Sequence, residues 1–287
     1  MPGELPEEPP GELPVVLVPG MLCDGWLWDG VRGAFTARTV EVIPDAPTLG
    51  GMAEQVLDAV DGPFVLVGLS LGAIVGFEVC RRAPERAVAL AALSTNAGAP
   101  RAEQLAGWRE LDRTTAEGGF AHAVETVLPG MFRTPDPGPE RAEGFREMAR
   151  RIGPDRFRAQ LAAQATRADA LPALAAYHGP VLVLCGGRDA LCPPAFHTAI
   201  ARAAPHARLR RLPGAGHLLP VEEPEATASV LRGWLESAAT GVPLSSPAKT
   251  ADGAAEGTAS RADGEVRAAA EYAGAPLAGN ERSEETA

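Results

Sequence analysis

Segments that favour strands alternate with segments that favour helices along most of this chain, and this alternation limits the folds that it can adopt. The first strand-like segment, Val15-Val16-Leu17-Val18, is a continuous apolar run rich in β-branched residues, as in a strand buried on both faces. Helical patterns at 48–60 and 71–82 separate later strand-like segments. Because strands that alternate with helices need crossover connections, the sequence predicts an α/β fold with a mostly parallel sheet flanked by helices. The six expected strands are 15–18, 39–43, 64–67, 88–93, 181–185 and 207–212.

The alternation is interrupted between residues 100 and 170. This stretch contains no convincing strand but three helical segments, at 101–117, 118–128 and 138–166. We therefore expect a helical cap, inserted after the strand at 88–93, in a core formed by 14–99 and 171–239.

The two ends of the sequence differ in composition from the rest. Residues 1–13 are rich in Pro and Glu, and residues 240–287 consist mainly of Ala, Gly, Ser, Thr, Glu and Pro. Such segments bury too little apolar surface to offset chain entropy. We expect a disordered arm at 1–13 and a disordered acidic tail at 240–287. The roughly 225 residues between them suit one α/β domain.

Composition argues against several classes of function. The formal charge is −11, and most of it lies in the two ends, so the core is only weakly acidic and has no basic stripe. This charge pattern therefore argues against nucleic acid as a partner. No apolar run reaches the roughly 18 residues of a membrane span. The four cysteines, Cys23, Cys80, Cys185 and Cys192, show no metal-ligand spacing. Without a signal peptide they are typical of free thiols in a cytoplasmic protein.

The motif Gly68-Leu69-Ser70-Leu71-Gly72 lies where a predicted strand meets a predicted helix. The letters alone are a weak signal, but this position makes the match specific. A turn this tight strains the backbone of the central residue, and side chains larger than Gly two residues away on either side would clash. The turn would raise the Ser70 hydroxyl above the sheet as a nucleophile. A Gly-rich turn of a nucleotide-binding fold is the alternative, but it lacks G-x-G spacing and a phosphate-binding Lys.

A serine nucleophile needs a base beside it, and an acid must orient that base. Of the five histidines, His217 alone follows the last predicted strand in a glycine-containing loop, Pro213-Gly214-Ala215-Gly216-His217. Asp189 follows the strand at 181–185, and loops at the carboxyl edge of a parallel sheet are where sites form. We expect Ser70, His217 and Asp189 to be nucleophile, general base and orienting acid. A surface ion pair with Arg188 is the alternative for Asp189.

The order Ser70, Asp189, His217 resembles that of the α/β-hydrolases. Further similarities are Pro84-Glu85-Arg86 and Gly216-His217-Leu218 followed by Glu223-Pro224-Glu225, so that the resemblance covers about residues 13–237. It is strongest for small, capped, esterase-like members that include enol-lactonases. The resemblance implies an oxyanion hole formed by the backbone N–H groups of Met21 and Leu71. The turn that contains Met21 follows the first strand and reads Val18-Pro19-Gly20-Met21. Many relatives carry His before the glycine of this turn, whereas this chain has Pro19.

Four apolar residues are candidates for the substrate pocket: Trp26, Trp28, Met131 and Phe132. The two tryptophans could equally pack their loop against the cap, and Met131 and Phe132 could form the core of the cap. No group of residues suggests a metal or cofactor, and we expect a small-molecule substrate.

The leading functional hypothesis is a serine hydrolase that cleaves a carboxylic ester, lactone or thioester through an acyl-enzyme. Ser70, rather than Asp, at the nucleophile position excludes the epoxide hydrolases and dehalogenases of the same family. An alternative is a lyase, cyclase or C–C bond hydrolase that uses the same triad on a biosynthetic intermediate. A non-catalytic binding module is a third possibility.

Overall fold

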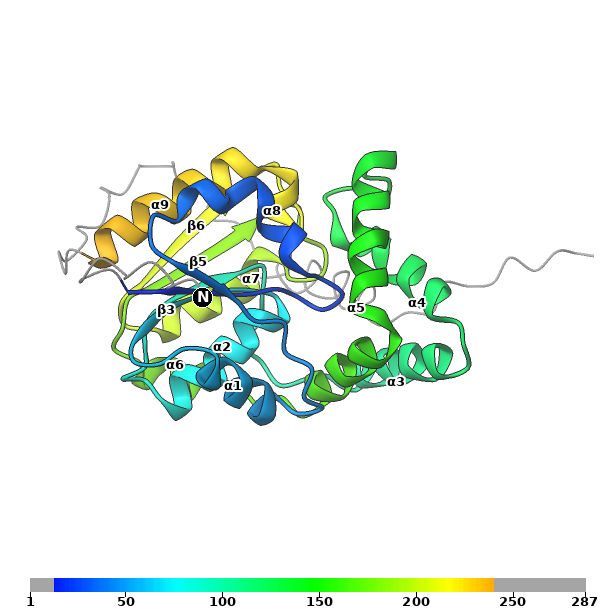
Figure 1. The fold of residues 1–287 in the computed structure, drawn as a ribbon, viewed down its shortest axis with the longest axis horizontal. Coiled ribbons are helices and arrows are strands. Elements are labelled where there is room, and N and C mark those ends of the chain that lie inside the picture. The colour runs from blue at the N-terminus through cyan, green and yellow to red at the C-terminus, as the bar shows by residue number, and fades with distance from the viewer. Residues whose placement is uncertain (1–12, 240–287) are drawn as a thin grey trace, which may run out of the picture.

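A six-stranded parallel sheet forms the centre of the computed structural model, which describes residues 13–239 (Figure 1). The strand order is β2-β1-β3-β4-β5-β6, and every neighbouring pair is parallel. The strands are β1 (Val15–Val18), β2 (Thr39–Glu41), β3 (Phe64–Leu69), β4 (Ala87–Leu93), β5 (Val181–Gly186) and β6 (Ala207–Leu212). The predicted fold class is confirmed. The disordered arm and acidic tail that the sequence predicts lie outside the described residues, except for residue 13.

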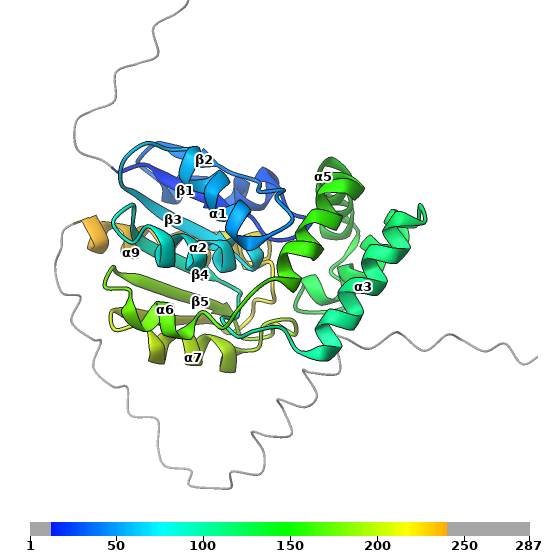
Figure 2. The same ribbon diagram turned by 90° about the horizontal axis from the view of Figure 1, so that it is seen from below.

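Helices cover both faces of the sheet and form a further group beyond one end of it (Figures 1 and 2). One face carries η1 (Gly25–Ala34), α8 (Leu219–Glu222) and α9 (Pro224–Ala239), which pack on one another. The other face carries α1 (Leu49–Asp58), α2 (Leu71–Arg82), α6 (Leu171–Ala176) and α7 (Pro194–Ala203). Between β4 and α6 the chain forms α3 (Ala102–Ala116), α4 (Phe120–Val127), η2 (Leu128–Met131) and α5 (Pro139–Ala165). We call residues 100–170 the cap segment.

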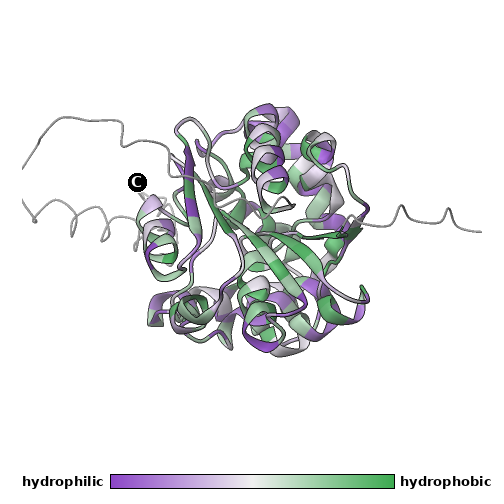
Figure 3. Cartoon of the chain, turned by 90° about the vertical axis from the view of Figure 1, so that its left-hand side faces the viewer, coloured by the Kyte–Doolittle hydropathy of each residue, from purple (hydrophilic) through white to green (hydrophobic). Residues whose placement is uncertain are grey.

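Alternate residues of the central strands enter two different cores. Val15 and Leu17 of β1 belong to the cluster under η1 and α9, whereas Val16 and Val18 belong to the cluster under α1 and α2. This explains the unbroken apolar run in β1, because both faces of the strand are buried. Figure 3 shows hydrophobic strands in the middle of the molecule, between helices of mixed polarity.

The two ends of the cap segment lie next to each other. The N–H of Ala170 donates to the carbonyl oxygen of Ala97 at 2.8 Å. Within the segment, α5 bends at Gly153, whose φ is 77°, and Pro154 follows it. Glycine tolerates this left-handed backbone, and proline cannot supply the N–H that a continuous helix would need. None of the helices within residues 13–239 is long and apolar enough to cross a bilayer.

Candidate active site

Ser70 occupies a strained turn between β3 and α2. Its φ of 54° and ψ of −113° lie outside the regions that L-residues favour. Two hydrogen bonds hold this residue in place. The Ser70 N–H donates to the Leu93 carbonyl at 2.8 Å, and Thr95 Oγ1 donates to the Ser70 carbonyl at 3.0 Å. Both partners lie at the end of β4, so the neighbouring strand fixes the position of the candidate nucleophile.

Close backbone packing explains the two glycines of the motif. A Cβ on Gly68 would lie 2.5 Å from the N atom of Ala73, and a Cβ on Gly72 would overlap the carbonyl oxygen of Val18. The end of β1 therefore packs directly against the first turn of α2. A Cβ on Gly20 would also lie 3.4 Å from Cβ of Ser70. The turn after β1 and the turn at Ser70 are thus adjacent.

The N–H groups of Met21 and Leu71 lie in these two adjacent turns. Within residues 13–239, neither N–H donates a hydrogen bond to another part of the chain. The first N–H groups of a helix have no intrahelical acceptor, and they carry the positive end of the helix dipole. Leu22, with a φ of 62°, bends the chain after Met21, and its N–H donates to Gln160 Oε1 of α5 at 3.0 Å. A side chain of the cap segment thereby holds the turn after β1.

His217 and Asp189 form a buried pair. The imidazole Nδ1 lies 2.9 Å from Oδ2 and 3.1 Å from Oδ1 of Asp189, and the two residues are 2% and 4% exposed. Asp189 Oδ1 also accepts the N–H groups of Leu191 at 3.0 Å and Cys192 at 2.8 Å. Because a carboxylate accepts from Nδ1–H, the remaining nitrogen, Nε2, has a free lone pair. In a neutral ring, this arrangement leaves Nε2 as the acceptor that the predicted role of general base requires.

Glu222 joins the His217 loop to the cap segment, and sequence analysis did not select it. Its carboxylate accepts the Gly216 N–H at 2.7 Å and the Arg133 N–H at 2.8 Å. The Leu218 N–H also donates to the Met131 carbonyl at 3.0 Å. Burial raises the pKa of Glu222, although the two N–H groups oppose the increase. The signal in the sequence that could have indicated Glu222 is its position as a carboxylate directly after the apolar run 218–221.

His197 contacts Thr95, beside the Ser70 turn, and its ring nitrogens contact the backbone. Its Nε2 accepts the Thr95 N–H at 2.8 Å, and Nδ1 lies 3.3 Å from the Pro193 carbonyl. Burial lowers the pKa of His197 to about 4, whereas the nearby Asp189 opposes the decrease. The ring is therefore neutral at pH 7. It connects α7 to the strand end that holds Ser70.

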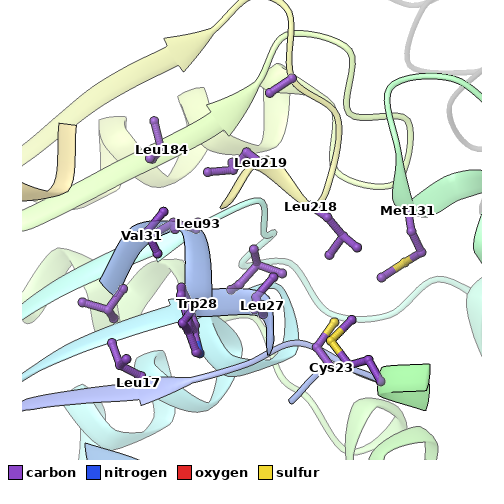
Figure 4. Packing of buried hydrophobic residues seen from close by; sticks show 14 of the residues in the cluster. Leu17, Cys23, Leu27, Trp28, Val31, Leu93, Met131, Leu184, Leu218 and Leu219 are labelled. Carbon is purple, nitrogen blue, oxygen red and sulfur yellow. The ribbon is translucent and has the colours of Figure 1, made fainter. Parts of the chain in front are cut away.

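The four candidate pocket residues have different environments. Trp28 is completely buried in the cluster under η1 (Figure 4), which favours the packing role that the sequence left open. Trp26 is partly buried and packs against Gly144 of α5. Met131 and Phe132 are buried beside the His217 loop. Figure 4 shows Met131, Leu218 and Cys23 from three separate segments of one apolar cluster.

Asp189, Cys192 and His217 form the one group within residues 13–239 whose potential ligand atoms lie within 4.8 Å of one another. The carboxylate already accepts hydrogen bonds from His217 Nδ1 and from two backbone N–H groups. Burial, followed by the charge of Asp189, raises the pKa of the Cys192 thiol. A metal would need the thiolate, so this environment disfavours metal binding.

Comparisons with known proteins give the family. The model of the alpha/beta hydrolase family matches residues 15–230. The chain belongs to this family. This alpha/beta hydrolase is 29% identical to the pimeloyl-[acyl-carrier protein] methyl ester esterase of Methylococcus capsulatus. The alignment extends over 243 residues and covers 78% of this chain and 94% of the relative. The protein is therefore a member of a hydrolase family and has an esterase among its relatives.

Solved structures of other proteins are also similar to this alpha/beta hydrolase. A thermophilic esterase from Thermogutta terrifontis is 30% identical, with a TM-score of 0.73, over 79% of this chain and 91% of that chain. The enol-lactonase from Burkholderia xenovorans is 21% identical, with a TM-score of 0.68, over 79% of this chain and 94% of that chain. At this lower identity the second comparison shows the fold alone.

Proposed function

We propose that the protein hydrolyses a carboxylic ester, lactone or thioester of a small organic substrate through a covalent acyl-enzyme. The observation that carries this proposal is the buried hydrogen bond of 2.9 Å between His217 Nδ1 and Asp189 Oδ2, in loops at the same sheet edge as Ser70. Relatives that are a methyl ester esterase and a thermophilic esterase support ester cleavage.

In the proposed mechanism, Ser70 Oγ attacks the substrate carbonyl while His217 Nε2 takes the hydroxyl proton. The tetrahedral oxyanion accepts hydrogen bonds from the N–H groups of Met21 and Leu71, and loss of one such donor typically costs about 3–4 kcal/mol. His217 then returns its proton to the leaving alcohol or thiol. A water molecule activated by the same imidazole hydrolyses the acyl-enzyme, and Asp189 stabilises each imidazolium.

We further infer that the cap segment selects the substrate. Gln160 contacts the turn after β1, and Arg151 Nε of α5 pairs with Asp24 at 2.5 Å. Trp26, Met131 and Phe132 join this segment to loops around the site, so they are candidates for contact with the acyl or leaving group.

The four free thiols favour a reducing compartment such as the cytoplasm.

Replacement of Ser70 by alanine tests the proposed nucleophile. We expect Ser70→Ala to reduce kcat for p-nitrophenyl butyrate by at least about 10⁴-fold, because the acyl-enzyme cannot form. Ser229→Ala, at an exposed position of α9, is the matched control and keeps full activity. A fluorophosphonate probe should add its mass to the wild type and to Ser229→Ala but not to Ser70→Ala.

Two results would contradict parts of this proposal. Undiminished turnover by Ser70→Ala would remove Ser70 as the nucleophile. Labelling of Ser70 without activity on any ester, lactone or thioester would replace hydrolysis with the use of the same triad in a lyase or cyclase.

A further inference from the structure

Arg167 is a buried cation without an acidic partner among the described residues. It follows α5, is 6% exposed and forms no ion pair within residues 13–239. Its Nη1 and Nη2 donate to Gln164 Oε1 and Gln104 Oε1, both at 3.2 Å, while its buried Nε has no partner there. Burial of a guanidinium is costly unless an opposite charge compensates it.

A small cavity lies between the cap segment and the core, and one of its lining residues, Gln104, accepts a hydrogen bond from Arg167. Its volume is about 180 Å³, and Asn96, Arg101, Gln104, Leu171 and Phe196 are among the residues that line it. Gln104 Oε1 accepts both the Arg101 N–H, at 3.1 Å, and Arg167 Nη2, so it connects the cavity wall to the buried guanidinium.

Arg101 is the charged residue among those that line this cavity, and Arg167, which does not line it, donates to the lining residue Gln104. Arg101 forms no ion pair with any residue between 13 and 239. Burial lowers the pKa of Arg167, and the nearby charge of Arg101 lowers it further. Because Gln104 Oε1 accepts from both the Arg101 N–H and Arg167 Nη2, the backbone of Arg101 lies close to the Arg167 guanidinium. The face of Trp108, 5.3 Å from Arg167 Cζ, compensates only part of this charge.

Two residues that line this cavity are chain neighbours of Thr95 and His197, which lie beside the Ser70 turn. Of these, Asn96 follows Thr95, whose hydroxyl donates to the Ser70 carbonyl. Phe196, which also lines the cavity, precedes His197, and His197 accepts the Thr95 N–H.

We propose that Arg101 and Arg167 form a subsite for a carboxylate carried by the substrate, at a distance from the bond that is cleaved. This inference rests on the proposed ester hydrolysis and narrows its substrate class to half-esters and other acyl compounds with a free carboxylate. A planar guanidinium matches a carboxylate in geometry as well as charge. The incoming oxygen atoms would take the Arg167 donors that now face glutamine amides or no acceptor.

Matched pairs of esters test the subsite. The measurement is kcat/KM for monomethyl succinate, monomethyl glutarate and monomethyl adipate, each compared with the methyl ester of the monocarboxylic acid of equal chain length. We expect at least one acidic ester to be preferred by about tenfold or more, and Arg101→Gln to reduce this preference about tenfold by removing one charge-assisted contact. Arg109→Gln, at an exposed position of α3, should retain the preference. Arg167→Gln should also reduce it.

Binding measurements separate failure of this inference from failure of the proposed hydrolysis. Calorimetry with the dicarboxylate of the preferred length should show binding to the wild type and about tenfold weaker binding to Arg101→Gln. Equal rates on acidic and neutral esters, without dicarboxylate binding, would overturn the subsite but leave ester hydrolysis intact. Dicarboxylate binding that depends on Arg101, without hydrolysis of any ester, would support the subsite and overturn the proposed reaction. Equally tight binding of inorganic phosphate would contradict a carboxylate-specific site.

Discussion

The backbone at Ser70 adopts a conformation that serine rarely populates, and its neighbours maintain it. The φ of Ser70 is positive, and Gly72 allows the end of β1 to pack against the first turn of α2. Such a strained conformation persists only where several contacts oppose its relaxation. The strand end at Leu93 and Thr95 supplies two of these contacts.

Gly72→Ala should prevent this packing. The added methyl group would overlap the Val18 carbonyl, which is backbone and cannot rotate away. We expect a loss of more than about 3 kcal/mol in the free energy of unfolding, measured by urea titration, together with loss of activity. Gly33→Ala is the control, since a Cβ there has no atom within 4 Å. Normal stability of Gly72→Ala would show that the turn relaxes easily.

Sequence identified the residues whose roles follow from local motifs but not those whose roles depend on distant contacts. Ser70, Asp189 and His217 each follow a predicted strand, so a parallel sheet places them at one edge. Glu222 holds a loop that lies 89 positions earlier in the chain, at Arg133. Local spacing contains no information about such a contact, and the catalytic roles of all three site residues stay predictions.

At the scale of elements, hydrophobic periodicity in the sequence predicts the boundaries of the long helices, but it does not predict the shortest helices. The helix predicted at 71–82 is α2, and the segments expected at 101–117 and 138–166 correspond closely to α3 and α5. The four-residue α8 and six-residue α6 were missed. Helices this short are unstable alone and form through tertiary contacts. One such contact is the buried Thr227 hydroxyl, which donates to the Leu219 carbonyl at 3.1 Å.

Glu222→Gln tests whether α8 positions the His217 loop. The amide keeps one acceptor but presents an NH₂ group to the other backbone N–H, so one buried donor loses its partner. We expect a loss of about 1–3 kcal/mol in the free energy of unfolding. We also expect a decrease in kcat on p-nitrophenyl butyrate that exceeds the change in KM. Glu225→Gln, at an exposed position in the first turn of α9, is the control. Unchanged stability and kcat would contradict a positioning role.

At the scale of the whole molecule, the sequence indicated the parallel sheet and its helical layers because both follow from alternation. It did not indicate the cavity beside Arg167. That cavity depends on Gln104 meeting an arginine 63 positions later and on the packing of α7 beside the end of β4. Neither relation leaves a periodic pattern in the chain.

The stability of the folded molecule should depend on His197. Its pKa is about 4 in the folded protein, against an ordinary value of 6.5, so the unfolded chain binds a proton at a higher pH than the native state. The free energy of unfolding should therefore fall as the pH decreases from 6.5 to 4, with a contribution of about 3 kcal/mol from this residue. Urea titrations between pH 7 and pH 4 measure the effect.

Two variants isolate the contribution of His197 from other titrating groups. His197→Gln retains an acceptor near the position of Nε2 but cannot gain the proton, so its stability should depend less on pH than that of the wild type. His178→Gln, at an exposed position, should follow the wild-type dependence. Identical pH dependence in all three proteins would exclude a buried neutral imidazole as its source.

The single hydrogen bond between Ala170 and Ala97 has an evolutionary consequence. Because the inserted helices leave and rejoin the core at neighbouring points, their length and sequence can change without altering the path of any strand. Descendants of such a chain could exchange one specificity for another by replacing this insert, as long as the new insert keeps the contacts that Gln160 and Arg133 make with the turn after β1 and with Glu222.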